Sequence, residues 1–541
     1  FESSSDQENF SYFRGLNEDI SGAELAVLPS LLLSMFLLFA FMCKKEVEKP
    51  AQSAELYQVS TINSRLLNRQ INYAVLLPEQ YYAGHDSFPV VYLLHGFGDN
   101  YTAWKLGGNI EYYAKTYASV TGSVIYVMPD GFNSYYVNRY NGKFPYMDMF
   151  VHELVPTIDS LFRTRKGSIY RAVMGYSMGG YGAMILPIKH PETFSAGVCL
   201  SMSFRTDEQY LKEPQSVFDY QFGAVFGGTG MAGNGRITDY FREHSPFYLF
   251  KDEDLTRYGQ WRFLIDCGDD EEQLNITNDD LHVLMQQQNL PHSYRVRNGA
   301  HSWDYWHASL PEAFCFLADG FNQQSISNDP EIQYSLTYPS PVQFDSLTPV
   351  NGSKVVHIMK PPSYKETERY PSIYIFTEDD TEGISQQSLE RFALLNDAMI
   401  KGKIPPSVLV SIPQFSDESL VENIQLIITG TDSLFHAIDS PSKRVILGFG
   451  NAGAKALSTI NLSSGYFGSC FLYNANIPDS FSESAPDLFY YLDQTDDNTF
   501  CAGYNKMYKW LKYNNLSFEY RVHKRMISSV AMQTGLYYSL H

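Results

Sequence analysis

Residues 168–184 have the sequence SIYRAVMGYSMGGYGAM, in which an apolar, strand-like run leads through Gly-Tyr-Ser-Met-Gly into a helix start made of small residues. A serine between a strand and a helix lies on a sharp turn, and the flanking glycines let the two elements approach closely. The turn projects the hydroxyl of Ser177 beyond the end of its strand. The stretch therefore predicts an α/β fold with a nucleophile at position 177.

Strand-like runs alternate with helical periodicity on both sides of this stretch. The strand-like runs are INYAVLLP (71–78), PVVYLLHG (89–96), SVIYVMPDG (123–131), AGVCLS (196–201), RFLIDCG (262–268) and SYRVRNG (293–299). Residues 147–162 and 278–288 have the period of a helix. This alternation predicts a mostly parallel sheet flanked by helices, with the functional site beyond the carboxyl ends of its strands.

The second half of the chain repeats the first. PPSVLVSIPQ (405–414) matches residues 122–131, SKRVILGFGNAGAKAL (442–457) matches residues 168–184, and residues 489–522 match residues 262–296. The alignment places Gly450 opposite Ser177, Thr377 opposite His95 and Ile527 opposite His301. We therefore predict two tandem α/β domains, a catalytic domain over residues 55–325 and a degenerate copy over residues 326–541 that lacks the serine and the histidine.

A serine hydroxyl needs a base to take its proton and an acid to orient that base, in the chain order Ser, acid, His. His301 fits this order, because it lies in GAHSWDYW (299–306), directly after the last strand-like run of the first half. His282, His292 and His307 are weaker candidates, since they lie on or beside predicted helices. We therefore expect His301 to be the base.

The acid is one of several carboxylates in the loop after RFLIDCG. This loop contains Asp269, Asp270, Glu271 and Glu272, whereas Asp266 lies within the strand and is expected to be structural. The second half has Asn498 and Thr499 opposite the two glutamates. If that half lost its whole catalytic set, a glutamate is the acid, and Asp270 remains an alternative.

The oxyanion that forms during attack on a carbonyl needs backbone donors, usually from the residue after the nucleophile and from the loop after an early strand. Met178 follows the serine, and Phe97 lies in the loop His95-Gly96-Phe97-Gly98. We expect the amides of Phe97 and Met178 to form the oxyanion hole.

Composition excludes several other functions. A formal charge of -20 repels phosphate backbones, so nucleic acid is not an expected partner. The six cysteines are far apart and form no CxxC pair, so neither a structural metal nor a cofactor is predicted. A chain of 541 residues is also longer than one hydrophobic core usually supports, in agreement with two domains.

The N-terminal region has the features of an export signal. Residues 25–42 are almost all apolar and end at Cys43, and the small Ala40 lies three residues before that cysteine. This pattern resembles a bacterial lipoprotein signal. We predict that residues 1–54 are an export segment and linker, with a lipid anchor at Cys43 and a location in the periplasm or at the cell surface.

LLHGFGDN (93–100), YVMPDGFNSYYV (126–137), GYSMGGYGAM (175–184) and GAHSWDYW (299–306) resemble the esterase family that includes esterase D, feruloyl and acetylxylan esterases, enterochelin esterases and mycolyltransferases. The resemblance covers residues 55–320 and implies an α/β-hydrolase fold with Ser177 as nucleophile and His301 as base. The family's usual acid position corresponds to Glu271 when counted from Gly268 and to Glu272 when counted back from Asn278. The second count favours Glu272, the acid preferred here.

The resemblance implies hydrolysis of feruloyl or acetyl esters on plant cell-wall xylan, so an esterified polysaccharide or oligosaccharide is the expected substrate. The aromatic-rich segment 202–258 lies where hydrolases insert a cap, and its rings either hold a feruloyl group or pack locally. One alternative is an esterase of the same family acting on a siderophore or a small thioester. The other is a non-catalytic protein that binds carbohydrate or a partner protein.

Overall fold

The computed structural model describes residues 55–251, 261–324, 343–348, 354–377, 384–463, 465–478 and 488–524. The predicted export segment, Cys43 and Ile527 lie outside these residues. The described residues from Leu56 onward belong to one compact unit. None of the helices in this described part is both long enough and apolar enough to cross a membrane.

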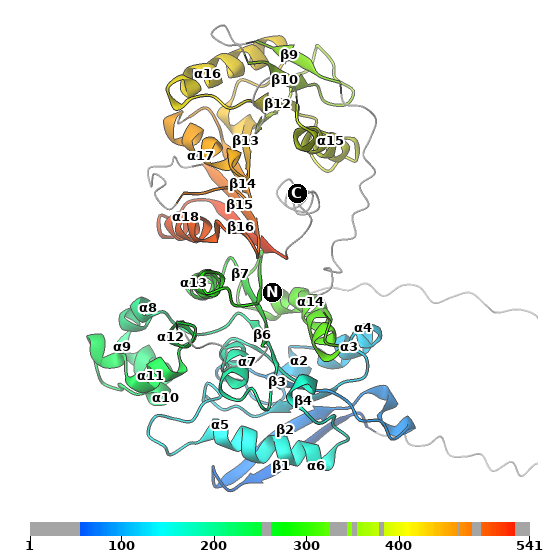
Figure 1. The fold of residues 1–541 in the computed structure, drawn as a ribbon, viewed down its shortest axis with the longest axis vertical. Coiled ribbons are helices and arrows are strands. Elements are labelled where there is room, and N and C mark those ends of the chain that lie inside the picture. Colours follow the sequence, from blue (N-terminus) through cyan, green and yellow to red (C-terminus); the bar gives the residue numbers. More distant parts are fainter. Residues whose placement is uncertain are drawn as a thin grey trace, which may run out of the picture. The chain divides into compact units, whose positions relative to one another are not determined.

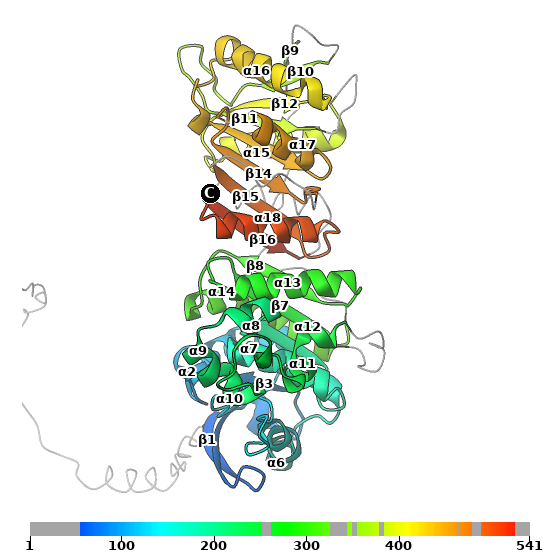
Figure 2. The same ribbon diagram turned by 90° about the vertical axis from the view of Figure 1, so that its left-hand side faces the viewer.

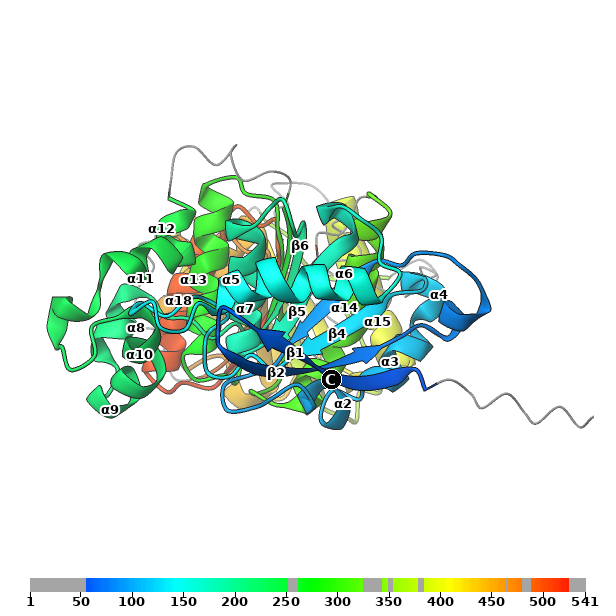
Figure 3. The same ribbon diagram turned by 90° about the horizontal axis from the view of Figure 1, so that it is seen from below.

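The first half contributes the strands β1 (Tyr57–Ser64), β2 (Arg69–Leu76), β3 (Val90–Leu94), β4 (Ile125–Pro129), β5 (Arg171–Tyr176), β6 (Ala196–Leu200), β7 (Arg262–Gly268) and β8 (Ser293–Arg297). Each strand-like run that the sequence shows in the first half forms one of the strands β2 to β8 in the structure. Strands β3 to β8 are parallel to one another, whereas β2 is antiparallel to both of its neighbours, β1 and β4. Figure 3 shows β1 and β2 at this edge, with α5 and α6 beside them.

The second half contributes β9 (Asp345–Leu347), β10 (Val356–Met359), β11 (Ser372–Phe376), β12 (Val408–Ile412), β13 (Arg444–Phe449), β14 (Ser469–Tyr473), β15 (Phe489–Thr495) and β16 (Phe518–His523). The strand order across the sheet is β1-β2-β4-β3-β5-β6-β7-β8-β16-β15-β14-β13-β11-β12-β10-β9. Each strand of the first half therefore has a counterpart eight strands later, at the mirrored place in the order. The order of the second half is that of the first, read from the opposite edge.

The sequence predicts two sheets, one for each domain, but the structure has one continuous sheet of 16 strands. The halves join where β8 and β16 lie side by side and antiparallel, with Val296 opposite Val522. Figure 2 shows this junction, with α13 and α18 next to each other across it. The physical reason is that each half ends in a strand with unpaired backbone groups, and their pairing removes two open sheet edges.

Helices cover both faces of the sheet (Figure 1). The helices of the first half are η1 (Glu79–Ala83), α2 (Ala103–Leu106), α3 (Ile110–Thr116), α4 (Ala118–Thr121), α5 (Tyr146–Met149), η2 (Phe150–Leu154), α6 (Val155–Leu161), η3 (Ser168–Tyr170), α7 (Met178–Lys189), α8 (Asp207–Lys212), α9 (Gln215–Val217), η4 (Phe218–Gly223), α10 (Ala224–Phe226), η5 (Gly233–Arg236), α11 (Asp239–His244), α12 (Pro246–Leu249), α13 (Leu274–Gln287) and α14 (Trp303–Phe321). Those of the second half are α15 (Gln386–Ile400), α16 (Asp417–Leu434), η7 (Pro441–Lys443), α17 (Ala452–Leu462) and α18 (Cys501–Tyr513).

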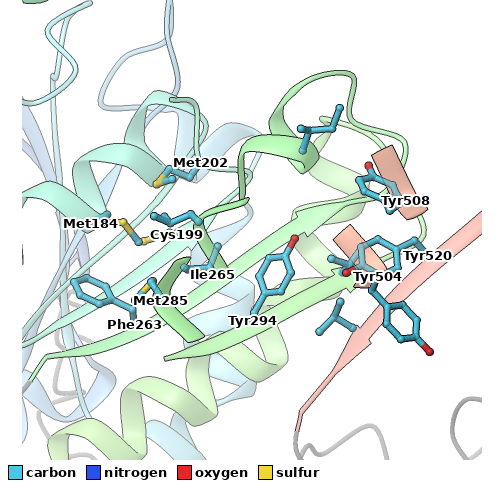
Figure 4. Packing of buried hydrophobic residues seen from close by; sticks show 14 of the residues in the cluster. Met184, Cys199, Met202, Phe263, Ile265, Met285, Tyr294, Tyr504, Tyr508 and Tyr520 are labelled. Carbon is cyan, nitrogen blue, oxygen red and sulfur yellow. The ribbon is translucent and has the colours of Figure 1, made fainter. Parts of the chain in front are cut away.

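The hydrophobic core differs between the two faces of the sheet. On the face of α7, α13, α17 and α18, one cluster of buried side chains extends through both halves. Figure 4 shows its central part, where Tyr294 of β8 lies between the side chains of β7 and the tyrosines of α18 and β16. On the face of α14 and α15 the core consists of two separate clusters, one in each half. The junction is therefore packed like a domain interior on one face.

Candidate active site

Ser177 lies between β5 and α7 with a strained backbone, φ 57° and ψ -121°. The flanking glycines have no room for a side chain, because a Cβ on Gly175 would lie 2.3 Å from the carbonyl oxygen of Gly179. A Cβ on Gly179 would lie 2.3 Å from the carbonyl oxygen of Leu94. The turn therefore has the strand-turn-helix geometry that the sequence predicts, and it places Ser177 at the carboxyl end of β5.

His301 lies in the loop between β8 and α14, and its Nδ1 is 2.8 Å from Oε2 of Glu271. Glu271 is buried, and its Oε1 accepts hydrogen bonds from the Ser201 hydroxyl and from the amide of Gly268, the latter at 3.2 Å. A carboxylate held in this way keeps the proton of His301 on Nδ1. Nε2 is then the nitrogen that can accept a proton from a nucleophile.

The acid position differs from the one preferred in the sequence. The structure brings Glu271 to His301, whereas Asp270 and Glu272 are exposed. Glu271 ends the turn that follows β7, where its amide donates to the carbonyl of Gly268, while Glu272 already belongs to the next, exposed turn. The geometry therefore favours Glu271 over Glu272 as the acid, and the catalytic role of Glu271 is a prediction.

Trp306, in the first turns of α14, connects these groups. Its ring is perpendicular to the imidazole of His301, with centroids 5.0 Å apart, and lies 4.3 Å from the ring of Tyr176, the residue before the nucleophile. Its Nε1 donates to the Ser201 hydroxyl at 2.8 Å. Sequence reasoning missed both Ser201 and Trp306. Trp306 lies in the motif GAHSWDYW, but no sequence pattern shows which groups an indole contacts.

The loop at the end of β3 is held by polar contacts, of which those of His95 are buried. The amide of Gly131 donates to Nε2 of His95 at 2.7 Å, and Nδ1 of His95 donates to the carbonyl of Gly96 at 2.8 Å. The amide of Gly98, at φ 85°, donates to Oδ1 of Asn133 at 2.8 Å. Phe97 lies between these anchored glycines, so its amide has a preorganised position. Its role as an oxyanion donor remains a prediction.

Met178 is the first residue of α7, where backbone N–H groups have no partner within the helix. Strands β3 and β5 are neighbours, with Leu94 opposite Gly175, so the loop after β3 and the start of α7 lie at the same edge of the sheet. This arrangement is compatible with two amides that face one oxyanion. The contribution of Met178 is likewise a prediction.

Aromatic side chains surround the loop after β3. Phe97 contacts Tyr220 of η4 edge-to-face, with ring centroids 5.5 Å apart, and Tyr135 at 6.2 Å. The ring of Tyr220 is 68% exposed. The hydroxyl of Tyr135 is 3.4 Å from that of Ser203, whose amide donates to the carbonyl of Ser177 at 2.9 Å. The segment 202–251 thus brings aromatic surface close to the nucleophile.

The cysteines and acidic side chains show no metal-binding arrangement in the described residues, where no group of three or more His, Cys, Asp or Glu is placed to hold an ion. Cys199, Cys267 and Cys470 are buried thiols and are not joined in disulfides. Burial raises the pKa of the Cys267 thiol well above its ordinary value, so this neighbour of Glu271 stays neutral.

The family described as "Putative esterase" matches residues 64–317 of the chain. The acetyl esterase of Caldicellulosiruptor saccharolyticus is 24% identical over 245 residues, which are 43% of this chain and 84% of that protein. The endo-1,4-beta-xylanase/feruloyl esterase of Xylanibacter ruminicola is 31% identical over 138 residues, 24% of this chain and only 19% of that protein. The solved structure of a ferulic acid esterase has a TM-score of 0.43 and 25% identity, and covers 49% of this chain and 97% of its own.

Proposed function

We propose that the protein is a serine esterase that removes feruloyl or acetyl groups from plant cell-wall xylan, and the match of residues 64–317 to the family described as "Putative esterase" supports this proposal. The observation that carries the proposal is the hydrogen bond between His301 and the buried Glu271 at the sheet edge where Ser177 also lies. A base oriented by a buried carboxylate, at the same edge of the sheet as a strained serine, is an arrangement that suits acyl transfer.

The reaction has two steps. The hydroxyl oxygen of Ser177 attacks the ester carbonyl while Nε2 of His301 takes its proton, and the negative charge on the carbonyl oxygen is stabilised by the amides of Phe97 and Met178. As the bond between the carbonyl carbon and the sugar oxygen breaks, His301 gives the proton to that oxygen, so the sugar leaves with a free hydroxyl and the acyl group stays on Ser177. Water, activated by the same nitrogen, releases the acid and restores the serine. Glu271 holds the imidazole and stabilises its charged form.

Aromatic residues support a feruloyl group as substrate. The exposed ring of Tyr220 against Phe97 offers a surface on which a second ring can stack next to the reacting carbonyl. The names of two relatives support the proposed class of substrate, since one is an acetyl esterase and the other an endo-1,4-beta-xylanase/feruloyl esterase. An acetyl group would need no such surface, so Tyr220 favours the feruloyl substrate.

The second half is, in this proposal, a degenerate copy of the first. Its strands follow the same order, and Gly450 occupies the place of Ser177 between β13 and α17. We also propose export and a lipid anchor at Cys43, because an enzyme of this specificity has to meet its polymer outside the cell.

Release of ferulate and acetate from arabinoxylan fragments tests the substrate, with wild type compared with Ser177→Ala. Ferulate released only by the wild type is the expected result. Acetate alone would redirect the assignment to deacetylation. If neither acid appears while a small aryl ester is still hydrolysed in a Ser177-dependent way, the polysaccharide substrate is wrong and the catalytic site stands.

A further inference from the structure

Two loops of the first half carry the acid and the base. The acid loop, residues 269–273, joins β7 to α13, and the histidine loop, residues 298–302, joins β8 to α14. They are tied together by Asp269, whose Oδ1 accepts from the amide of Gly299 at 3.2 Å, and by the amide of Asp270, which donates to the carbonyl of Gly299 at 3.1 Å. Whatever holds the acid loop therefore also holds the approach to His301.

The second half supplies the partners of the acid loop. Lys512, on the last turn of α18, donates from Nζ to the carbonyl oxygen of Glu271 at 2.6 Å and to Oδ1 of Asn275 at 3.0 Å. The same Nζ is 3.4 Å from the carbonyl oxygen of Asp269. Oδ2 of Asp269 accepts from the amide of Tyr520 at 3.2 Å and pairs with the guanidinium of Arg521, both on β16.

The mirrored contact on the other side of the junction is made by an uncharged side chain. The alignment that places Arg521 opposite Arg295 also places Gln286 opposite Lys512. Gln286 donates to the carbonyl of Asp496, as Lys512 does to that of Asp269, and Oδ2 of Asp496 accepts from the amide of Tyr294 at 3.4 Å and from Arg295 at 2.6 Å. Each half therefore holds a loop of the other half through equivalent contacts. The loop that carries the acid receives a cation, whereas its counterpart receives a neutral amide.

The pKa of Lys512 lies below its ordinary value because the side chain is buried. The nearby acidic groups act in the opposite direction but do not cancel the effect of burial. An ammonium group removed from water in this way needs oxygen acceptors around it, and here two of those acceptors are main-chain oxygens of the acid loop. Main-chain contacts fix the path of the loop rather than the rotamer of one side chain.

We propose that Lys512 is a positioning residue for catalysis, through which the second half holds the carboxylate of Glu271 against His301. The inference rests on the proposed function, because it assigns a role in the same reaction. The second half then contributes to the active site of the first half, although its own sequence has no nucleophile and no base at the matching positions. Its contribution is the geometry of the acid loop.

The test is Lys512→Gln in the full chain, which reproduces the residue found at the mirrored position. The matched control is Lys509→Gln, one turn earlier on α18, which loses the ion pair with Asp280 across the same junction but touches no residue of the acid loop. With a small aryl ester, Lys512→Gln should lower kcat about 10- to 100-fold with KM nearly unchanged, because a displaced acid impairs the chemical step. Lys509→Gln should stay within about twofold of wild type.

A double-mutant cycle separates positioning from general destabilisation. In the Glu271→Gln background, Lys512→Gln should cause no further loss of kcat, since its effect passes through the carboxylate. Lys512→Arg, which keeps the positive charge, should recover most of the activity. Equal kcat in wild type and Lys512→Gln, or the same loss from Lys509→Gln, would overturn the inference. Absence of Ser177-dependent turnover in the wild type would instead overturn the proposed function.

Discussion

The two halves contain the same turn with different chemistry. Ser177 follows β5 at φ 57°, and Gly450 follows β13 at φ 50°. The amide of Ser177 donates to the carbonyl of Leu200 at 2.9 Å, and that of Gly450 donates to the carbonyl of Tyr473 at 3.2 Å. Each turn also accepts an amide hydrogen bond, from Ser203 in the first half and from Asn476 in the second. The backbone of the turn is therefore retained where the nucleophile is absent.

The replacement of serine by glycine in the second half indicates that the shape of the turn can be kept without the catalytic groups. Glycine adopts a positive φ without the steric cost that an L-residue bears, so the second half keeps the shape and relieves the strain. In the first half the strain remains because the hydroxyl has to project from the turn. Each prediction below changes one side of this comparison.

The largest effect is expected from the nucleophile itself. Ser177→Ala should lower kcat/KM for a small aryl ester by about a thousandfold or more, since no other group on the turn can attack the carbonyl. Circular dichroism should show an unchanged fold. Adding Gly450→Ser to this variant should restore no activity, because Thr377 stands where the first half has His95. Activity of the double variant would show that the second site is not degenerate.

The acid gives the next effect. Glu271→Gln should lower kcat about 10²- to 10⁴-fold, because a neutral amide neither orients His301 correctly nor stabilises its charged form. Glu272→Gln and Asp270→Asn, which change exposed neighbours, should remain within about twofold. Steady-state kinetics on the three variants decides the assignment. A larger loss from Glu272→Gln would return the acid to the position that residue counting favours.

The junction should show a pH dependence of stability that depends on Asp279. Its Oδ2 accepts from Nδ2 of Asn505 at 2.7 Å, and burial raises its pKa to about 6. The folded state then binds a proton more tightly than the unfolded state, so this group stabilises the fold below about pH 4 and the benefit is lost as pH rises to about 6.

Asp279→Asn removes that titration. Relative to wild type, its free energy of unfolding should rise by about 1–3 kcal/mol between pH 4 and pH 7. Urea denaturation across this range measures the difference. A difference between variant and wild type that does not change with pH would show that Asp279 does not titrate in the folded protein.

The smallest effect concerns the strain of the two turns. Ser177→Gly should raise the free energy of unfolding by about 1 kcal/mol, and Gly450→Ser should lower it by a similar amount, because the same positive φ is cheap for glycine and costly for serine. Thermal denaturation of both single variants measures this. Changes of the same sign would contradict the equivalence of the two turns.

Much of the first half could be predicted from local sequence. Strands β2 to β8 follow from apolar runs bounded by turn residues, and the turn at Ser177 follows from glycines whose absent side chains leave room for neighbouring backbone. The acid could not be predicted, because adjacent residues on a loop differ in direction and not in chemistry. Only the fold of the loop shows that Glu271 is buried against His301 while Glu272 is exposed.

The sequence by itself determined the alternation of strands and helices, and it predicted Ser177 and His301 as candidates and a repeat that pairs Ser177 with Gly450. These features depend on residue type and on short spacings along the chain. Only the tertiary structure decided that both halves share one sheet, and that Lys512 lies 2.6 Å from the carbonyl oxygen of Glu271. The pairing of β8 with β16 joins residues more than two hundred positions apart, and no local pattern specifies which edges of a sheet meet.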